Sequence, residues 1–248
     1  VSFYNTKQKS NNHIMATKNN EEPKTGIENL NDSLTKAEQR VEKNKKLIMW
    51  ICIAAAAVVA LVLIYIYAIY KPGVNNANTE YGKASNKEFM LQAQPSDSAR
   101  IAAEKDVLKS FEAAATKGHD GGNNATLMAA VHNYKAGDYN KALKYLQDYD
   151  RKDKVIGTTS KALEGDCYVN LKQYDKAIDC YKEAIDIAEQ NPELVPYCML
   201  KEAVVYRHLK KYTEEADIYK QLLEQYPQYG ESHNIDFKAA LSRAQSSK

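Results

Sequence analysis

Residues 164–184, EGDCYVNLKQYDKAIDCYKEA, decide the fold, because two other stretches of the chain repeat their pattern. Residues 129–149 read AAVHNYKAGDYNKALKYLQDY, and residues 202–222 read EAVVYRHLKKYTEEADIYKQL. Each stretch has a tyrosine at the same place, and these tyrosines stand 35 and 38 positions apart: Tyr139, Tyr174 and Tyr212. A period of about 34 residues, made of helix, short turn and helix, indicates helix pairs that stack into a solenoid.

The three stretches resemble the tetratricopeptide repeat family, in which small residues lie where paired helices touch and large residues fill the gaps. The middle stretch fits best. The resemblance implies that the packing residues are Ala130, Gly137, Tyr139, Ala142 and Leu146, then Gly165, Tyr168, Leu171, Tyr174, Ala177, Tyr181 and Ala184, and then Ala203, Tyr206, Leu209, Tyr212, Tyr219 and Pro227. Asn133 replaces the first aromatic residue of the first copy. Glu215 stands where the third copy should have a small residue, which predicts a local slip in register.

We therefore expect an all-α chain, because helical periodicity dominates from residue 76 onward and the alternation typical of strands is missing from the sequence. A degenerate leading helix pair, over residues 76–92 and 96–117, is expected before the repeats. A capping helix with a polar outer face is expected after them, as the end of a solenoid requires. The expected boundaries are 76–117 for the leading pair, 123–156, 158–191 and 196–229 for the repeats, and 231–245 for the capping helix.

Residues 47–70, LIMWICIAAAAVVALVLIYIYAIY, contain no charged residue, proline or glycine. As a helix they would be about 36 Å long, enough to cross a hydrocarbon core of about 30 Å. Trp50 near one end and Tyr65, Tyr67 and Tyr70 near the other suit the headgroup level. The run is too long for a signal peptide, so we interpret it as an uncleaved transmembrane helix that contacts lipid.

Cations flank this run unequally. Five of them precede it within eleven residues, Lys36, Arg40, Lys43, Lys45 and Lys46, whereas only Lys71 follows before Lys83. The imbalance favours a cytoplasmic N-terminus and a repeat domain on the opposite side of the membrane.

The segments on either side of the span carry further expectations. Residues 1–26 are polar and are expected to be an unstructured cytoplasmic segment, with residues 1–14 upstream of a true start at Met15. Over residues 27–46 the apolar side chains recur at spacings of three and four, a heptad pattern that would form a homodimer, dock on a partner helix or lie along the lipid surface. Pro72 and Gly73 are expected to stop the helix and make residues 71–78 a linker.

Several function classes are disfavoured. A net charge of +2 does not indicate a nucleic-acid partner. The sequence has no C-x-x-C, no metal-ligand spacing of Cys and His, no glycine-rich phosphate loop and no H-E-x-x-H or G-x-S-x-G, so we expect neither a cofactor nor an enzyme. His119 lies in residues 119–124, which are expected to be an ordinary loop. A thiol-dependent enzyme is the remaining catalytic alternative, with Cys167, Cys180 and Cys198 as its candidate residues.

The family resemblance implies a function in protein binding, through a concave surface lined by the first helix of each repeat. Transferring the family's spacing to this chain gives Leu127, Val131, Tyr134 and Lys135, then Ala162, Asp166, Val169 and Asn170, and then Leu200, Val204, Arg207 and His208. A polar edge with apolar anchors suits an extended peptide or a helix laid in a groove.

The order of span and repeats is similar to a narrower group, the membrane-anchored ancillary subunits of the bacterial Sec translocon. The resemblance rests on residues 38–50, EQRVEKNKKLIMW, on residues 118–124 and on the helix spacing from residue 76. It implies a bacterial inner-membrane protein with a periplasmic repeat domain, and translocon subunits, a periplasmic folding factor or exported chains as partners. The alternative is a scaffold for envelope or cell-division assembly without a link to Sec.

Overall fold

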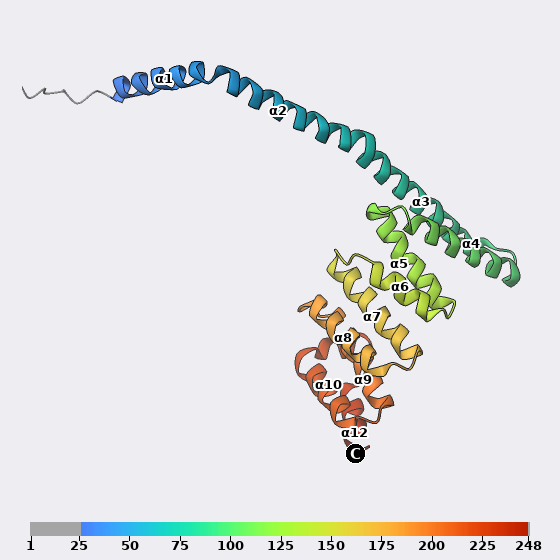
Figure 1. Ribbon diagram of the computed structural model, residues 1–248. Helices are drawn as coiled ribbons and strands as arrows, with labels where there is room; N and C mark the ends of the chain where they lie inside the picture. The colour runs from blue at the N-terminus through green and yellow to red at the C-terminus, as the bar shows by residue number, and fades with distance from the viewer. Residues whose placement is uncertain (1–25, 248) are drawn as a thin grey trace, which may run out of the picture. The chain divides into compact units, whose positions relative to one another are not determined.

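The computed structural model describes residues 26–247, which are helical without a strand in that range (Figure 1). The chain divides into two compact units after Leu63. The expectations for residues 1–25 lie outside the described range. The all-α prediction is confirmed for residues 26–247.

The first unit contains α1 (Gly26–Lys43) and most of α2 (Lys45–Ile64). They are separated at Asn44, where two donors share one carbonyl: the Asn44 backbone N and the side-chain Nδ2 lie 3.1 Å and 3.0 Å from Arg40 O. A side chain that competes for the i−4 carbonyl is a recognised cause of helix bending. The predicted helix over residues 27–46 therefore ends one turn short of the apolar run.

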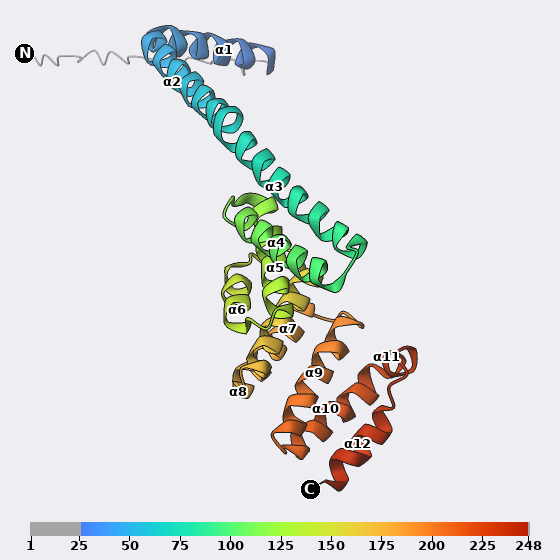
Figure 2. The ribbon, with the colours of Figure 1, turned by 90° about the vertical axis from the view of Figure 1, so that its right-hand side faces the viewer.

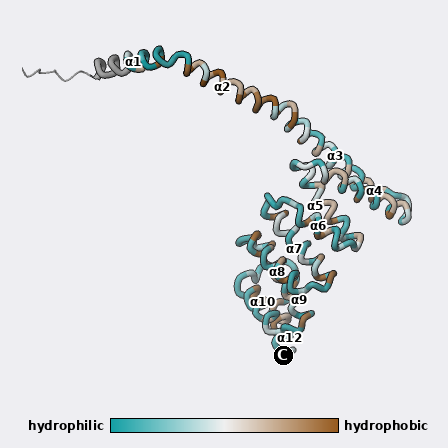
Figure 3. Tube along the Cα trace, in the orientation of Figure 1, coloured by the Kyte–Doolittle hydropathy of each residue, from teal (hydrophilic) through white to brown (hydrophobic). Residues whose placement is uncertain are grey.

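The predicted span over residues 47–70 lies in a helix that runs from Lys45 to Phe89. Its most apolar window has a mean hydropathy of 3.0 and no buried residue, so this helix is long and apolar enough to cross a membrane. Figure 3 shows mostly apolar colours along α2 after its first residues. It is the one helix of that character among residues 26–247.

The second unit begins with η1 (Tyr65–Tyr70), a π-helical turn, and α3 (Lys71–Phe89). The prediction of a linker over residues 71–78 is therefore wrong. In the π turn Lys71 N donates to Ile66 O, five residues back, and this wider turn lets Pro72 follow without ending the helix. Gly73 serves close packing, because a Cβ there would lie 2.6 Å from His119 Nε2.

The rest of the second unit is a stack of antiparallel helix pairs (Figure 2). The predicted leading pair is present, with Ser96 as the N-cap of its second helix. The helices after α3 are η2 (Met90–Ala93), α4 (Asp97–Ala115), α5 (His119–Lys135), α6 (Tyr139–Asp148), α7 (Lys154–Asn170), α8 (Tyr174–Ala188), α9 (Leu194–His208), α10 (Tyr212–Gln225), α11 (Pro227–Ser232) and α12 (Phe237–Ser246).

Two boundary predictions are wrong. Residues 119–124 are not a loop but the start of α5, and Gly121 is small because a Cβ there would lie 2.6 Å from the backbone of Ala77 in α3. The capping segment 231–245 is not one helix, because a turn at Asn234 separates α11 from α12. Gly121 thus allows two helices to pack closely and does not form a flexible turn.

The same turn joins consecutive helices at four places, α5 to α6, α7 to α8, α9 to α10 and α11 to α12. Its left-handed residue is Gly137, Lys172, Lys210 or Asn234, with φ between 54° and 81°. In each case the N–H of the next residue bonds to a carbonyl five positions back, as from Lys211 N to Tyr206 O at 2.9 Å. The slip in register predicted at Glu215 is therefore wrong, because α8 and α10 begin at the same point after this turn.

Most of the predicted packing residues lie between helices. Gly165 is buried against Tyr181, and a Cβ at Gly165 would lie 2.6 Å from that ring. The buried ones are Ala130, Ala142, Leu146, Gly165, Ala177, Tyr181, Ala184, Ala203 and Tyr219, and the half-buried ones are Tyr139, Tyr168, Leu171, Tyr174, Tyr206, Leu209 and Tyr212. Gly137 and Pro227 are exposed and do not pack, because one forms a turn and the other begins α11.

Candidate protein-binding surface

The surface predicted to bind a partner comes from α5, α7 and α9, the first helices of three consecutive pairs. We call it the α5–α7–α9 face. Of its predicted residues, Lys135, Asn170, Val204 and His208 are exposed, and Leu127, Val131, Tyr134, Asp166, Val169, Leu200 and Arg207 are half-buried. Ala162 is fully buried in the core between α7, α8 and α9, so it cannot contact a partner and its assignment to the surface is wrong.

Asp166 is the polar centre of this face. Its Oδ1 accepts a hydrogen bond from Tyr181 Oη at 2.7 Å, and Lys201 Nζ lies 2.9 Å from Oδ1 and 2.8 Å from Oδ2. Lys201 Nζ also stands 5.0 Å from the centre of the Tyr197 ring. The carboxylate thus joins α7 to α8 and α9, and it is already neutralised before any partner arrives.

The electrostatics agree with this role. Burial alone would lower the pKa of Lys201, but the hydrogen bond and the charge of Asp166 outweigh it and raise that pKa. Burial and the same carboxylate raise the pKa of Tyr181. Lys201 therefore stays charged and Tyr181 stays protonated at neutral pH, so both keep the protons that they donate to Asp166.

A second contact joins the first two helices of the face. Asn170 Nδ2 lies 3.4 Å from Tyr134 Oη, and the Tyr134 ring meets Tyr139 edge-on at a centroid distance of 5.5 Å. Burial raises the pKa of Tyr134. Tyr134 is thus held in place by its neighbours, while Asn170 remains largely open to solvent.

The C-terminal end of α9 contacts α10, its partner in the same pair, and α8 of the preceding pair. Arg207 Nε lies 3.8 Å from Glu215 Oε1 in α10, and the His208 ring stands 4.6 Å from the Tyr174 ring. These contacts leave Arg207 and His208 only in part available to a partner.

Two of the apolar side chains that stay open on this face are on α9. Val204 is 50% exposed and Tyr197 is 37% exposed, and they are two helical turns apart on the same side of the helix. The repeat pattern of the sequence did not select Tyr197 or Lys201. Tyr197 could have been predicted, because it lies seven residues before Val204 and so on the same side of the helix. Lys201 could not, because its role depends on its contact with Asp166, which only the structure shows.

The three cysteines of the repeats are poorly suited to thiol chemistry. Each is buried, and burial raises the pKa of Cys167, Cys180 and Cys198 to about 12. A nucleophilic cysteine needs a lowered pKa and an accessible sulfur atom. Among residues 26–247 no group of three or more Cys, His, Asp or Glu side chains is placed to hold a metal ion.

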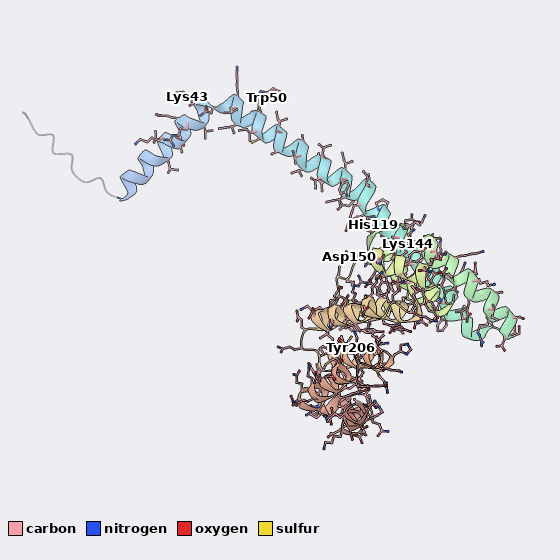
Figure 4. The ribbon with its side chains drawn as sticks, turned by 60° about the horizontal axis from the view of Figure 1, so that its bottom comes forward. Lys43, Trp50, His119, Lys144, Asp150 and Tyr206 are labelled. Carbon is pink, nitrogen blue, oxygen red and sulfur yellow. The ribbon has the colours of Figure 1, made fainter. Side chains whose placement is uncertain are left out.

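A separate cleft of about 650 Å³ lies between α4, α5 and α6, away from the predicted residues. His119, Lys144 and Asp150 line it (Figure 4). Its other charged groups are mostly paired, as Lys141 Nζ is with Glu112 Oε1 at 2.6 Å. This pairing makes it a solvated surface between helices rather than a site with free charge.

Two segments of the chain match family models described as tetratricopeptide repeat, over residues 162–191 and residues 197–229. They correspond to α7–α8 and α9–α10, the second and third predicted repeats. A comparison with curated proteins gives no match. Tetratricopeptide repeats imply a protein–protein interaction scaffold, and repeat proteins of this kind are generally not enzymes.

Proposed function

We propose that the tetratricopeptide repeats at residues 162–191 and 197–229 belong to a membrane-tethered scaffold that captures a protein partner on the α5–α7–α9 face. The observation that carries this proposal is the open apolar pair Tyr197 and Val204 beside the neutralised Asp166–Lys201 bridge. An apolar anchor next to satisfied polar groups suits a peptide, because no buried charge has to lose its partner on binding.

The tether is the second part of the proposal. The exposed apolar surface of α2 supports a membrane span, and the five cations before it support a cytoplasmic N-terminus with the repeats on the periplasmic side. Tethering raises the effective concentration of the repeats near other membrane proteins without new contacts.

The partner class we propose is a polypeptide in export, or a translocon subunit or periplasmic folding factor beside the Sec channel. The support is the architectural resemblance to the ancillary translocon subunits, a single N-terminal span followed by the repeats. A face with separated apolar anchors accommodates an extended or partly folded chain.

Site-specific photo-crosslinking in living bacteria tests the proposal. A photoreactive residue replaces Val204 or Asn170 on the α5–α7–α9 face, and Lys220 or Asp179, exposed on the second helices α10 and α8, in the control variants. We expect adducts of exported chains or translocon subunits from the first two positions only. Adducts of division or cell-wall proteins would replace the Sec assignment with the envelope scaffold, and adducts from the second helices alone would refute the proposed face.

The topology has its own test. Protease added to spheroplasts should digest the repeats and leave the N-terminal segment intact, and the chain should stay in the membrane fraction at alkaline pH. Protection of the repeats in intact spheroplasts, with digestion only after lysis, would reverse the proposed orientation.

A further inference from the structure

Helices α3 and α5 lie side by side, run in the same direction and begin almost level with each other. At one end a Cβ on Gly73 would lie 2.6 Å from His119 Nε2, and at the other end His132 Nε2 lies 3.2 Å from Glu88 Oε1. Gly73 and Glu88 are about 22 Å apart along α3. The start of α5 is therefore fixed beside the start of α3.

The turn between α4 and α5, residues 116–118, lies at this same end. Tyr70, the last residue of η1, meets the ring of His119 edge-on at a centroid distance of 5.4 Å. Figures 1 and 2 show the turn beside the first residues of α3. All these residues belong to the second compact unit, so the α4–α5 turn is held next to Tyr70 by contacts within one unit.

Tyr70 marks the level of the bilayer surface in the proposed tether. The span over residues 47–70 would be about 36 Å long, about 6 Å longer than a hydrocarbon core of about 30 Å, so its last turn extends into the headgroups. Tyr67 and Tyr70 are exposed and suit that layer, and Lys71 Nζ lies 4.2 Å from the centre of the Tyr67 ring. The headgroup layer is about 5–7 Å thick on each side, so side chains beside the Tyr70 ring reach it as well.

The exposed side chains at the turn suit headgroups rather than acyl chains. Thr116, Lys117 and His119 are polar and exposed. Asp120, also exposed, has Lys152 Nζ at 3.1 Å from its Oδ1. Charges of both signs thus stand at this end of the unit, which matches a zwitterionic and hydrated headgroup layer and requires no excess of anionic lipid.

We propose that the packing of α5 on α3 holds the α4–α5 turn in the headgroup layer, with Thr116, Lys117 and His119 against phospholipid headgroups. The inference rests on the proposed membrane span, because Tyr70 lies at the surface only if the apolar run crosses the bilayer. It gives the repeats a second contact with the membrane. It also sets the height of the α5–α7–α9 face, since α5 then runs away from the bilayer and ends up to about 25 Å from the headgroups.

The test uses the full chain in phosphatidylcholine vesicles in which some lipids carry a nitroxide quencher on the headgroup. Cys52→Ala/Thr116→Cys carries a fluorophore at the turn, and the cysteines of the repeats are buried and stay unlabelled. Cys52→Ala/Ala136→Cys is the matched control, because Ala136 is exposed and lies at the other end of α5. Quenchers in both leaflets make the result independent of the direction in which the chain inserts.

We expect the headgroup quencher to quench the Thr116 label several-fold more than the Ala136 label. Equal quenching of the two labels would overturn the proposal. Equally weak quenching would mean that the repeats stand clear of the bilayer, and equally strong quenching would mean that they lie flat on it.

Lengthening the helix before the contact tests whether α3 sets the position of the turn. Seven alanines inserted between Tyr70 and Lys71 add about two helical turns, or about 10 Å, and nearly preserve the direction in which the repeats project. The insertion should lift the turn out of the headgroup layer and lower the quenching of the Thr116 label to the Ala136 value. Unchanged quenching, in a variant whose circular dichroism shows that it is folded, would contradict the proposal.

A fluorophore on Cys52 of the wild-type chain distinguishes this proposal from the tether, because Cys52 is the exposed cysteine of α2. A nitroxide placed shallowly on the acyl chains should quench it. An unquenched Cys52 label would show that α2 does not span the bilayer, and would remove the tether together with the contact of the turn. A quenched Cys52 label with a Thr116 label that is quenched no more than the Ala136 label would refute the contact alone.

Discussion

Glu215 Oε1 lies 3.2 Å from Arg243 Nη2, and this contact ties α10 to the last helix, α12. The Glu215 residue is 1% exposed, although the corresponding positions in the two preceding repeats hold alanines, Ala142 and Ala177. The third pair therefore keeps the helix geometry of its neighbours and accommodates a charge in place of a methyl group. The nearby Arg207, at 3.8 Å from the same oxygen, gives further compensation.

Removing Arg243 should cost more than removing both members of the pair. Arg243→Ala leaves a buried carboxylate with only the more distant Arg207, and we expect a loss of about 1–3 kcal/mol, less than a fully buried pair would lose because Arg243 is half exposed. Glu215→Ala/Arg243→Ala should recover part of that loss. Thermal unfolding of the full chain in detergent, followed by circular dichroism, measures both; a double variant less stable than Arg243→Ala would contradict the argument.

Enlarging the small residues at helix crossings should destabilise the solenoid. In Gly165→Leu the side chain meets the Tyr181 ring, and in Ala177→Leu it enters a fully buried position, so each should cost about 1–3 kcal/mol. Gly82→Ala is the matched control, since a Cβ at Gly82 meets nothing within 4 Å, and it should stabilise α3 by about 0.5–1 kcal/mol. Unchanged unfolding temperatures for both leucine variants would count against close packing at these crossings.

The protein should lose stability in alkali through its buried thiols. Burial raises the pKa of Cys198 from 9.0 to about 12, so its contribution to folding is fully present below pH 9 and is lost as pH rises through 12. Each such thiol should lower the free energy of unfolding by about 1.4 kcal/mol per pH unit in that interval. Cys198→Ala should make the decline between pH 9 and 12 shallower, and an identical slope in the two proteins would show that the thiol does not ionise on unfolding.

Acid should loosen the leading helix pair. His132 is 7% exposed, stacks on Phe111 at a centroid distance of 5.4 Å and lies 3.2 Å from Glu88 Oε1. Burial, assisted by Lys135, lowers its pKa below 6.5, and this outweighs the opposite effects of Glu88 and Glu104. A depressed pKa means that stability is present above pH 6.5 and is lost as pH falls toward the folded-state pKa.

His132→Gln should therefore reduce the fall in stability below pH 6.5, measured as the difference from the wild-type chain in urea unfolding. His208→Gln, which changes an exposed histidine of α9, is the control and should follow the wild-type profile. Equal effects of the two substitutions would point to net charge rather than to the buried ring.

Partner capture should depend on the open apolar pair of α9. Val204→Asp introduces a charge at a half-exposed position and should weaken crosslinking or co-purification about tenfold or more, as expected when an apolar anchor is lost. The unfolding temperature should remain that of the wild-type chain, since Val204 packs little. Ile101→Asp, at an exposed position on α4, is the matched control; equal losses in the two variants would place the binding surface elsewhere.

The repeats could be predicted from the sequence because their signal is local and periodic. Tyr139, Tyr174 and Tyr212 begin α6, α8 and α10, as their alignment requires. The long apolar helix was similarly evident, since an unbroken apolar run needs no tertiary context. The same holds for Ser96 as an N-cap, where the side chain accepts from Ala99 N at 3.3 Å.

The errors occurred where a distant residue decides the structure. Pro72 and Gly73 are typical of a helix end. The helix continues through them because a π turn precedes Pro72 and His119 packs against Gly73. The roles of Glu215 and Asp166 depend on Arg243 and Lys201, which lie 28 and 35 positions away in the sequence. No pattern within one helix indicates such a pairing. A candidate surface could therefore be proposed by analogy, but the sequence could not show which of its side chains are buried and which are exposed.

The turn shared by the helix pairs also bears on how the chain could change length. Lys172 and Lys210 occupy the same point of the same turn and have nearly equal φ angles, 59° and 60°. The segment between them therefore behaves as an interchangeable module: its removal or duplication would rejoin the backbone in the same conformation. The positive φ angles strain these two lysines modestly, because only glycine adopts such angles without a steric cost. We infer that packing between neighbouring modules stabilises the turn at each junction. An array of this design can gain or lose surface in steps of one whole helix pair.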